Sequence, residues 1–371
     1  MVAQRRAICA KVSTPLALDA TLWDEPVTGI GLYTHALAGA LSAQGSHPRL
    51  FGARTTGGAP RGRLGRTAWT LGALPTALQD HDVRCYHAFG NFNLPLARLK
   101  DCRFVLTVHD VIPLLLPDTV SRPFHWQFRL WLSRSVQLAD QILCVSETTR
   151  RDLVRCHPAA GGKATVVLNG VDHVAQHRAL TPASLAAVDA LELPEHYVLF
   201  AGAWDVRKNL KLVLSAFRRL PARSRPSLVL AGQPWFGSGA ANRQVAELRA
   251  DGRDVRVLGY LPSPVLYEVM ARAAVFVFPS LYEGFGLPAL EAMWLSVPTV
   301  ISQTGSLPEV CGDAALAVDP EDDQGLAAAI AQLLRPSAER TQRQRAGRAW
   351  AEAFTWQRAA RQTLEIYRSL S

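Results

Sequence analysis

The segment from Val275 to Glu291 joins a strand, a glycine-rich loop and the start of a helix. Val275–Phe278 is a run of β-branched and aromatic residues, which is typical of a buried strand. Gly284 and Gly286 allow the backbone that follows to turn tightly, and Pro288 suits the first position of a helix, where its missing N–H costs nothing. This order of strand, loop and helix predicts one step of a doubly wound α/β sheet.

Two carboxylates, Glu283 and Glu291, frame the same loop. The N–H groups of Gly286 and Leu287 lie at the start of the predicted helix, where unpaired N–H groups bind anions. Glu291 falls in the first turn of that helix, where a carboxylate can accept hydrogen bonds from a pair of vicinal hydroxyls. A diphosphate and a ribose would satisfy both features. The alternative is an ordinary turn in which Glu291 only complements the helix dipole, but the pair of acids around the glycines favours a ligand site.

The rest of the chain alternates between strand and helix signals, and its length of 371 residues favours two domains. Strand signals lie at residues 7–12, 49–52, 83–88, 104–108, 141–145, 164–168, 197–201, 227–231, 255–258, 275–278 and 297–301. Helix signals lie at residues 31–43, 124–137, 147–156, 209–220, 263–273 and 288–294, and they dominate residues 322–369. We expect a Gly/Arg-rich loop at residues 55–66 and an Ala-rich, partly helical linker between the domains at residues 175–194.

The run from Glu283 to Glu291 resembles the Glu-x7-Glu motif of glycosyltransferase family 4, whose members transfer a sugar from a nucleotide diphosphate donor with retention of anomeric configuration. Four further segments are similar to family motifs and follow the family's order. They are the glycine loop at Thr28–Tyr33, the His-Asp strand end at Thr107–Asp110, the Gly-x4-Arg-Lys-Asn segment at Gly202–Leu210 and the loop at Gly305–Val310. Together these segments extend over nearly the whole chain.

The resemblance implies the GT-B fold, in which two Rossmann-like doubly wound domains face a central cleft and the C-terminal helix crosses back to the first domain. The implied parts are an acceptor domain at residues 1–180, a nucleotide-sugar donor domain at residues 190–353 and a returning helix at residues 354–371. The motif variants around Gly29 and His109 are similar to those of bacterial mannosyl- and rhamnosyltransferases of surface-polysaccharide assembly. GDP-mannose is therefore the expected donor, with UDP-sugars as the alternative.

Arg207 and Lys208 are the cations that the resemblance assigns to the donor diphosphate. They follow a predicted strand that ends just before Gly202, and doubly wound sheets bind their ligands at the carboxyl ends of strands. An adjacent Arg-Lys pair is more often solvated, and Ala203 stands where one family variant has arginine, but the position after the strand favours a function. The implied donor-binding residues, with Tyr260 and Leu261 meeting the base through their backbone, are Gly202, Arg207, Lys208, Tyr260, Leu261, Gly284, Phe285, Gly286, Leu287 and Glu291.

The resemblance implies three catalytic residues: Glu283, Lys208 and His109. Lys208 would neutralise the charge that grows on the diphosphate as the glycosidic bond breaks. Glu283 is either a nucleophile, as in retaining glycosidases, or a positioning residue in a front-face transfer in which the departing phosphate takes the acceptor proton. His109 ends a predicted strand, where its neutral imidazole or its backbone carbonyl would stabilise positive charge on the sugar ring. The alternative for His109 is a structural histidine fixed by Asp110.

Gly29, Ile30 and Gly31 open a helix after a loop, and with Asp110 they form the expected acceptor and diphosphate loop. Their spacing is similar to a dinucleotide-binding fingerprint, but Thr34 takes the place of the third glycine and no acidic residue follows a strand at the expected distance. A nicotinamide cofactor is therefore disfavoured. The alternative is a helix start that uses glycine only for a tight turn.

We expect no cofactor and a metal-independent reaction. The sequence contains no His/Cys cluster, and its six cysteines show no Cys-x-x-Cys pairing. A disulfide framework is not expected. No apolar run approaches the roughly 18 residues of a membrane span, and residues 1–12 lack the apolar core of a signal peptide, so we expect a cytoplasmic protein.

Positive charge is concentrated in the first half of the chain. Residues 1–185 hold 20 Lys and Arg against 12 Asp and Glu, so they carry +8 of the total net charge of +9. The predicted helix at residues 124–137 carries Trp126 and Leu130 beside its main apolar face. The Gly/Arg-rich loop earlier in the chain contains Arg54, Arg61, Arg63 and Arg66. These features predict peripheral contact with anionic membrane on the cytoplasmic face of the inner membrane.

The expected function is retaining transfer of a hexose to a glycan or a polyprenyl-diphosphate-linked acceptor. Nucleic acid is not an expected partner, because the chain has no binding motif for it. The alternative is a non-catalytic GT-B protein that binds a nucleotide or a partner subunit. The presence of Glu283, Glu291, Arg207 and Lys208 disfavours that alternative.

Overall fold

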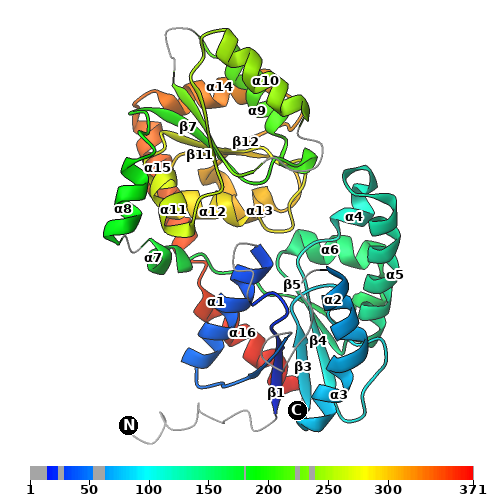
Figure 1. Ribbon diagram of the computed structural model, residues 1–371. Helices are drawn as coiled ribbons and strands as arrows, with labels where there is room; N and C mark the ends of the chain where they lie inside the picture. Colours follow the sequence, from blue (N-terminus) through cyan, green and yellow to red (C-terminus); the bar gives the residue numbers. More distant parts are fainter. Residues whose placement is uncertain are drawn as a thin grey trace, which may run out of the picture. The chain divides into compact units, whose positions relative to one another are not determined.

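The computed structural model describes residues 15–23, 29–52, 63–178, 181–221, 226–233 and 239–370. The chain forms two compact units: unit 1 consists of residues 1–170 and 356–371, and unit 2 of residues 171–355 (Figure 1). Within the described residues, each unit contains a six-stranded sheet. The predicted strand at residues 7–12 lies outside the described residues.

The sheet of unit 1 is parallel throughout, with strand order β2-β1-β3-β4-β5-β6. Its central strands are apolar on both faces, as a parallel sheet covered by helices requires. The strands are β1 (Leu16–Asp19), β2 (Arg49–Phe51), β3 (Cys85–Ala88), β4 (Arg103–Val108), β5 (Gln141–Cys144) and β6 (Ala164–Val166). β1 was not predicted, because it is short and ends in a buried carboxylate, that of Asp19.

Helices cover both faces of this sheet, and the C-terminal helix α16 packs against α1, as the GT-B resemblance implied (Figure 1). The helices are α1 (Gly29–Ala43), α2 (Arg63–Ala68), η2 (Trp69–Ala73), α3 (Leu74–Asp80), α4 (Ile112–Leu115), η3 (Pro117–Thr119), α5 (Arg122–Leu138), α6 (Glu147–Cys156), η4 (Pro158–Ala160) and α16 (Trp356–Ser369). The predicted end of the loop at residue 66 is wrong, because Arg63 and Arg66 belong to α2. Arg54 and Arg61 lie outside the described residues.

The sheet of unit 2 is also parallel, with strand order β12-β11-β10-β7-β8-β9. Its strands are β7 (Tyr197–Ala201), β8 (Ser227–Ala231), β9 (Val255–Gly259), β10 (Val275–Phe278), β11 (Thr299–Ser302) and β12 (Leu316–Val318). The helices are α7 (His173–His177), α8 (Pro182–Asp189), η5 (Val206–Lys208), α9 (Leu210–Arg219), α10 (Gly239–Ala250), α11 (Ser263–Ala271), α12 (Leu287–Trp294), α13 (Leu307–Cys311), η7 (Gly312–Ala314), α14 (Asp323–Leu334) and α15 (Ala338–Glu352). In Figure 1, α9, α10 and α14 cover one face, and α11, α12, α13 and α15 cover the other.

The predicted linker at residues 175–194 is instead part of unit 2. Helices α7 and α8 pack against α11, and Arg178 forms an ion pair with Glu268 of α11 at 3.1 Å. The N–H of Val171 donates to the carbonyl of Phe354 at 2.9 Å, so the two segments at the limits of unit 2 run side by side. The partly helical character of this stretch was predicted, but its helices pack within unit 2.

Across the residues that the structure describes, no helix combines the length and the apolar character that a membrane crossing requires.

Candidate functional site

The turn after β7 places Arg207 and Lys208 beside the end of β10. Asp205 begins the turn η5, and its carboxylate accepts a hydrogen bond from the N–H of Lys208 at 2.9 Å. Asn209 has a left-handed backbone with φ of 56°, which asparagine tolerates better than most residues. Its side-chain amide donates to the carbonyls of Pro279 at 3.1 Å and Pro320 at 2.8 Å. These bonds fix the turn against the loops that follow β10 and β12.

Glu283 receives both cations on one carboxylate oxygen. The Nζ of Lys208 and the Nη1 of Arg207 each lie 2.7 Å from Oε1 of Glu283. The Nζ of Lys208 also lies 4.5 Å from the centre of the Phe278 ring. Burial alone would raise the pKa of Glu283, but Lys208 and Arg207 more than offset it, and the pKa is lowered. Glu283 is therefore ionised at neutral pH. The Nη2 of Arg207 also lies 3.6 Å from Oδ2 of Asp205, so the two cations face two carboxylates.

The loop after β11 supports Glu283 through its backbone. The carbonyl of Glu283 accepts hydrogen bonds from the N–H and the hydroxyl of Ser306, at 3.1 and 3.0 Å. Gly305 has φ of 62°, and a Cβ there would lie 2.8 Å from the carbonyl oxygen of Glu283. Only glycine allows this close approach without a shift of the backbone. The family-like segment at residues 305–310 thus has a local role in holding the Glu283 loop.

The glycine loop continues into α12 as predicted, but the helix begins one residue earlier than predicted. Gly286 is the residue before the helix and has φ of 97°, and the helix begins at Leu287. This positive φ favours glycine, and a Cβ on Gly286 would also lie 2.4 Å from Cδ2 of Leu307, whose side chain would have to move. Phe285 is buried, with its ring centre 6.2 Å from that of Phe354. Gly284 is buried within the same loop.

Glu291 is buried in the first turns of α12 together with two residues that the sequence analysis did not identify. The Nε2 of His173 lies 2.9 Å from Oε1 of Glu291, and the hydroxyl of Tyr267 donates to the same oxygen at 3.2 Å. Burial, followed by Glu291, raises the pKa of Tyr267 well above its usual range. No local pattern marks His173, because it lies 118 positions from Glu291 in the sequence.

The remaining predicted donor residues lie at neighbouring strand ends of the same sheet. Gly202 follows β7, and its N–H donates to the carbonyl of Ala231 at the end of β8 at 3.0 Å. A Cβ on Gly232 would lie 2.0 Å from the carbonyl oxygen of Gly202, so the two strand ends are in close contact. Tyr260 and Leu261 follow β9, and the side chain of Tyr260 is 48% exposed. Unit 2 therefore gathers its predicted residues at the carboxyl edge of its sheet.

In unit 1, His109 lies just beyond the end of β4. Its Nε2 donates to the carbonyl of Phe89 at 2.9 Å, because a carbonyl can only accept, and this leaves the lone pair on Nδ1. The ring of Tyr33 meets the imidazole edge to face, with centres 4.8 Å apart. Burial lowers the pKa of His109 to about 4, so the imidazole is neutral at pH 7.

A buried chain of hydrogen bonds runs behind His109. The hydroxyl of Thr107 lies 3.0 Å from that of Tyr33 and 2.7 Å from Nε2 of His87, whose Nδ1 lies 2.6 Å from the hydroxyl of Tyr367. Burial lowers the pKa of His87 to about 3. The chain connects β3 and β4 to the C-terminal helix α16. These contacts could not be predicted from the sequence, because the residues come from distant segments.

The other predicted residues of unit 1 have structural partners. The carboxylate of Asp110 accepts a hydrogen bond from the N–H of Ile112 at 3.0 Å, at the start of α4. The carbonyl of Asp110 accepts from the amide of Asn91 at 3.3 Å. Gly29, Ile30 and Gly31 form the first turn of α1.

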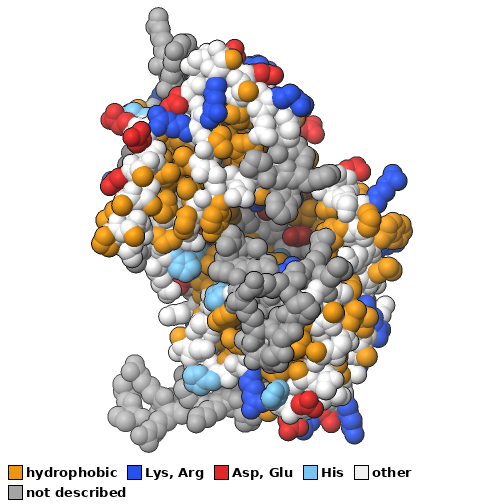
Figure 2. All heavy atoms as spheres, viewed as in Figure 1, with side chains coloured by type: hydrophobic (Ala, Val, Ile, Leu, Met, Phe, Trp, Pro, Cys, Tyr) orange, Lys and Arg blue, Asp and Glu red, His pale blue; other side chains and the backbone are white. Residues whose placement is uncertain are grey.

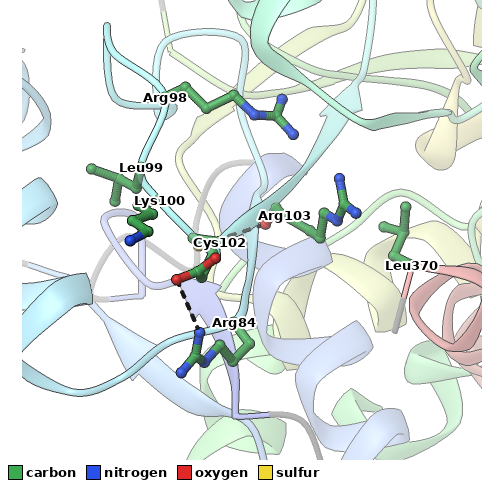
Figure 3. Close-up of a pocket in the computed structure, with 8 residues that line it drawn as sticks. Arg84, Arg98, Leu99, Lys100, Cys102, Arg103 and Leu370 are labelled. Carbon is green, nitrogen blue, oxygen red and sulfur yellow. Dashed lines mark hydrogen bonds and ion pairs between the residues drawn. The ribbon is translucent and has the colours of Figure 1, made fainter.

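A pocket of about 690 Å³ in unit 1 involves none of the predicted site residues (Figure 3). Its lining residues are Arg84, Arg98, Leu99, Lys100, Asp101, Cys102, Arg103 and Leu370. Arg84 pairs with Asp101 at 3.6 Å, and Arg103 pairs with Asp140 at 3.2 Å. The pocket lies at the amino ends of β3 and β4, whereas doubly wound sheets bind their ligands at the carboxyl ends. We therefore place the candidate site elsewhere.

The neutral histidines predict that acid destabilises the protein. The unfolded chain takes up protons near the ordinary histidine pKa of 6.5, whereas folded His109 and His87 do so only near 4 and 3. Their contribution to stability is therefore complete above about pH 6.5 and is lost as the pH falls, by about 1.4 kcal/mol per pH unit for each group. The buried carboxylate of Asp19, whose pKa burial raises, acts in the opposite direction.

Urea unfolding between pH 7.5 and 5 would measure this dependence. We expect a His87→Asn variant to show a shallower loss of stability on acidification than the parent, and the exposed His47, changed to Asn, to show the parent's slope. Equal slopes for the parent and His87→Asn would contradict the assignment of His87 as a neutral buried group.

Residues 27–174 match the family model described as Glycosyltransferase Family 4, and residues 186–350 match the model described as Glycosyl transferases group 1. The O-antigen chain mannosyltransferase B of Escherichia coli is 34% identical over 311 residues, which cover 82% of this chain and 77% of that protein. The alpha-maltose-1-phosphate synthase of Mycolicibacterium smegmatis is 31% identical over 285 residues, which cover 72% of this chain and 73% of that protein.

The fold is similar to that of a solved structure. HepE of Anabaena, crystallised with UDP and glucose, matches this chain with a TM-score of 0.71 at 18% sequence identity, over 96% of this chain and 100% of that one. The two parallel sheets, their helices and the sequence matches define a GT-B glycosyltransferase. The chain belongs to glycosyltransferase family 4.

Proposed function

We propose that this protein is a retaining hexosyltransferase that transfers mannose from GDP-mannose to a glycan or a lipid-linked oligosaccharide in surface-polysaccharide synthesis. The observation that carries the proposal is the cluster of Lys208, Arg207 and Glu283 beside the start of α12. The choice of mannose rests on the relative from Escherichia coli, which is named a mannosyltransferase.

The cluster has the charge that a departing diphosphate requires. As the glycosidic bond breaks, negative charge develops on the leaving phosphate, and cations held in advance stabilise it more than they stabilise the substrate. Lys208 and Arg207 supply two cationic groups beside the carboxylates of Glu283 and Asp205, and the N–H groups at the start of α12 add partial positive charge. A nucleoside diphosphate is the ligand chemistry that fits this arrangement.

The geometry of Glu283 favours a positioning role over a nucleophilic one. Its Oε1 is engaged by two cations at 2.7 Å, and their charges hold its pKa below the usual range. Both effects reduce the electron density available for attack on an anomeric carbon. We infer that Glu283 orients the donor sugar and the two cations, and that the departing phosphate takes the acceptor proton.

His109 of unit 1 is neutral, which is the protonation state that the reaction would need. A neutral imidazole adds no positive charge near a sugar ring that itself becomes positive in the transition state. The Nδ1 lone pair that the bond to Phe89 leaves in place, or the backbone carbonyl of His109, would stabilise that ring. Gly29, Ile30, Gly31 and Asp110 stand as the proposed residues that meet the acceptor or the diphosphate.

The nucleotide preference tests the proposal. We expect GDP to raise the melting temperature of the protein more than UDP or ADP does at equal concentration, because only a ligand that binds the folded state stabilises it. A larger increase in melting temperature with UDP would leave the proposed transferase reaction in place but make a UDP-sugar the donor instead of GDP-mannose. The absence of a shift with all three diphosphates at millimolar concentration would contradict the proposed donor site.

We also propose that the reaction needs no metal ion, because Lys208 and Arg207 supply the positive charge. Activity should therefore be unchanged after dialysis against excess chelator, as measured by release of nucleoside diphosphate. A loss of activity that Mg²⁺ or Mn²⁺ restores would contradict this.

The proposed acceptor explains an exposed surface on α5. Trp126 and Leu130 are 56% and 69% exposed and lie one helical turn apart. Arg129 stacks on Trp126 at 5.3 Å, and Arg134 bonds to the carbonyl of Leu96, which is itself 44% exposed. Figure 2 shows hydrophobic and basic side chains together at the edge of unit 1 that α4 and α5 form. Large apolar side chains among arginines suit an anionic membrane surface, where a lipid diphosphate would be available.

Co-sedimentation with vesicles tests this contact. We expect binding to vesicles with anionic lipid at low salt, loss of binding at high salt, and at least a tenfold weaker association for Trp126→Gln/Leu130→Gln. Leu185 of α8 is also exposed, at 41%, and Leu185→Gln is the matched control that should bind like the parent. Equal binding of the α5 variant and the parent would remove α5 from the contact.

A further inference from the structure

Glu291 lies in a buried polar group that ties α12 to α7 and α11. Glu291, His173 and Tyr267 are 6%, 3% and 4% exposed, so the carboxylate depends on hydrogen bonds from the protein. His173 at 2.9 Å and Tyr267 at 3.2 Å both contact the same oxygen, Oε1. Two contacts on one oxygen fix the rotation of the carboxylate and so determine the direction of Oε2.

We propose that His173 is a positioning residue for ribose recognition: together with Tyr267 it holds Glu291 so that Oε2 is presented to the ribose hydroxyls of the donor. This inference rests on the proposed function, in which Glu291 binds the ribose. A carboxylate that must accept bonds from two vicinal hydroxyls loses affinity when it rotates, because charge-assisted hydrogen bonds depend on geometry. His173 is therefore a determinant of the preference for ribonucleotides over deoxyribonucleotides.

A second contact between α7 and α11 allows the role of His173 to be distinguished from a general effect of α7 packing. Arg178, at the end of α7, forms an ion pair with Glu268 of α11 at 3.1 Å, and Glu268 also pairs with Arg272 at 2.8 Å. Loss of Arg178 would loosen α7 without removing a contact of Glu291. An Arg178→Gln variant is therefore the matched control for a structural effect.

Two substitutions of His173 differ in where they place a donor. In His173→Gln the side-chain amide can reach the position of Nε2, which contacts Glu291. In His173→Asn the shorter side chain places its amide near Nδ1, away from that carboxylate. Tyr267→Phe removes only the second contact on Oε1.

The experiment measures the affinity of each variant for GDP, UDP or ADP, whichever binds the parent most tightly, and for its 2′-deoxy analogue, by calorimetry. We expect the parent to prefer the ribonucleotide by about tenfold or more, the typical effect of a hydrogen bond to a charged group. His173→Asn should reduce this preference to about threefold or less, with Tyr267→Phe in between. His173→Gln and Arg178→Gln should keep it, and melting temperatures report separately on folding.

The possible outcomes distinguish this inference from the function on which it rests. Binding of none of the three diphosphates by the parent would overturn the proposed function and this inference with it. A ribonucleotide preference that His173→Asn retains in full would overturn the role of His173 alone, as would an equal loss of preference in His173→Asn and Arg178→Gln.

Discussion

A Lys208→Met enzyme is expected to lose about 10²–10³ in kcat, which is the typical effect of removing one group that stabilises developing negative charge. The ammonium group of Lys208 lies 2.7 Å from Glu283, within the cluster that we assign to the leaving diphosphate. Methionine keeps an unbranched apolar chain in place of the lysine stem and removes the ammonium group, which lies 4.5 Å from the centre of the Phe278 ring. The loss should fall mainly on kcat, because the interaction is strongest in the transition state.

Steady-state kinetics with release of nucleoside diphosphate would measure this effect. Lys211, an exposed residue of α9, is the matched control, and Lys211→Met should have parent kinetics. A Lys208→Met enzyme with kcat within about threefold of the parent would show that Lys208 does not stabilise the leaving group.

Glu283→Gln should reduce both stability and activity. Neutralisation of Glu283 leaves Lys208, whose side chain is 13% exposed, without its carboxylate partner. Arg207, which is 22% exposed, keeps only the longer pair with Asp205 at 3.6 Å. Breaking a buried ion pair by removing one partner typically costs about 3–5 kcal/mol. The two cations would also repel one another and leave the positions in which they meet the diphosphate, so kcat should fall with stability.

A double-mutant cycle separates the two causes. Urea unfolding of Glu283→Gln, Lys208→Met and the combined variant should show that the combined variant is less destabilised than the sum of the single changes, because it removes both members of one ion pair. Additive losses of stability would mean that Lys208 and Glu283 are not coupled in the folded protein, against the 2.7 Å contact.

Strands that consist of a continuous run of apolar residues could be predicted from the sequence. The predicted ranges of β7, β8 and β10 agree with the structure at both ends, because each is a run of buried residues between breaks. β12, with one exposed residue between two half-buried ones, and α10, with many polar residues, have no such pattern and were not predicted. Their formation depends on pairing with β11 and on packing against α9.

Some contacts of the candidate site could also be predicted from the sequence, and others could not. The meeting of Lys208 and Glu283 follows from topology, since they lie just beyond β7 and β10, and those strands are neighbours in the sheet. The contact of His173 with Glu291 could not be predicted, because it depends on how α7 packs near α11 and α12. Asp205 could have been identified, since an aspartate just before a turn is a common capping residue.

The central claim is that the protein transfers a hexose from a nucleotide diphosphate sugar with retention of configuration. The most direct test is proton NMR of the reaction with GDP-mannose and a synthetic polyprenyl-diphosphate glycan, following the anomeric signal of the product while GDP is released. We predict one equivalent of GDP for each sugar transferred and an α-linked product from the α-linked donor. A β-linked product, or no transfer from GDP-, UDP- or ADP-sugars to this acceptor or to a soluble mannoside, would contradict the claim.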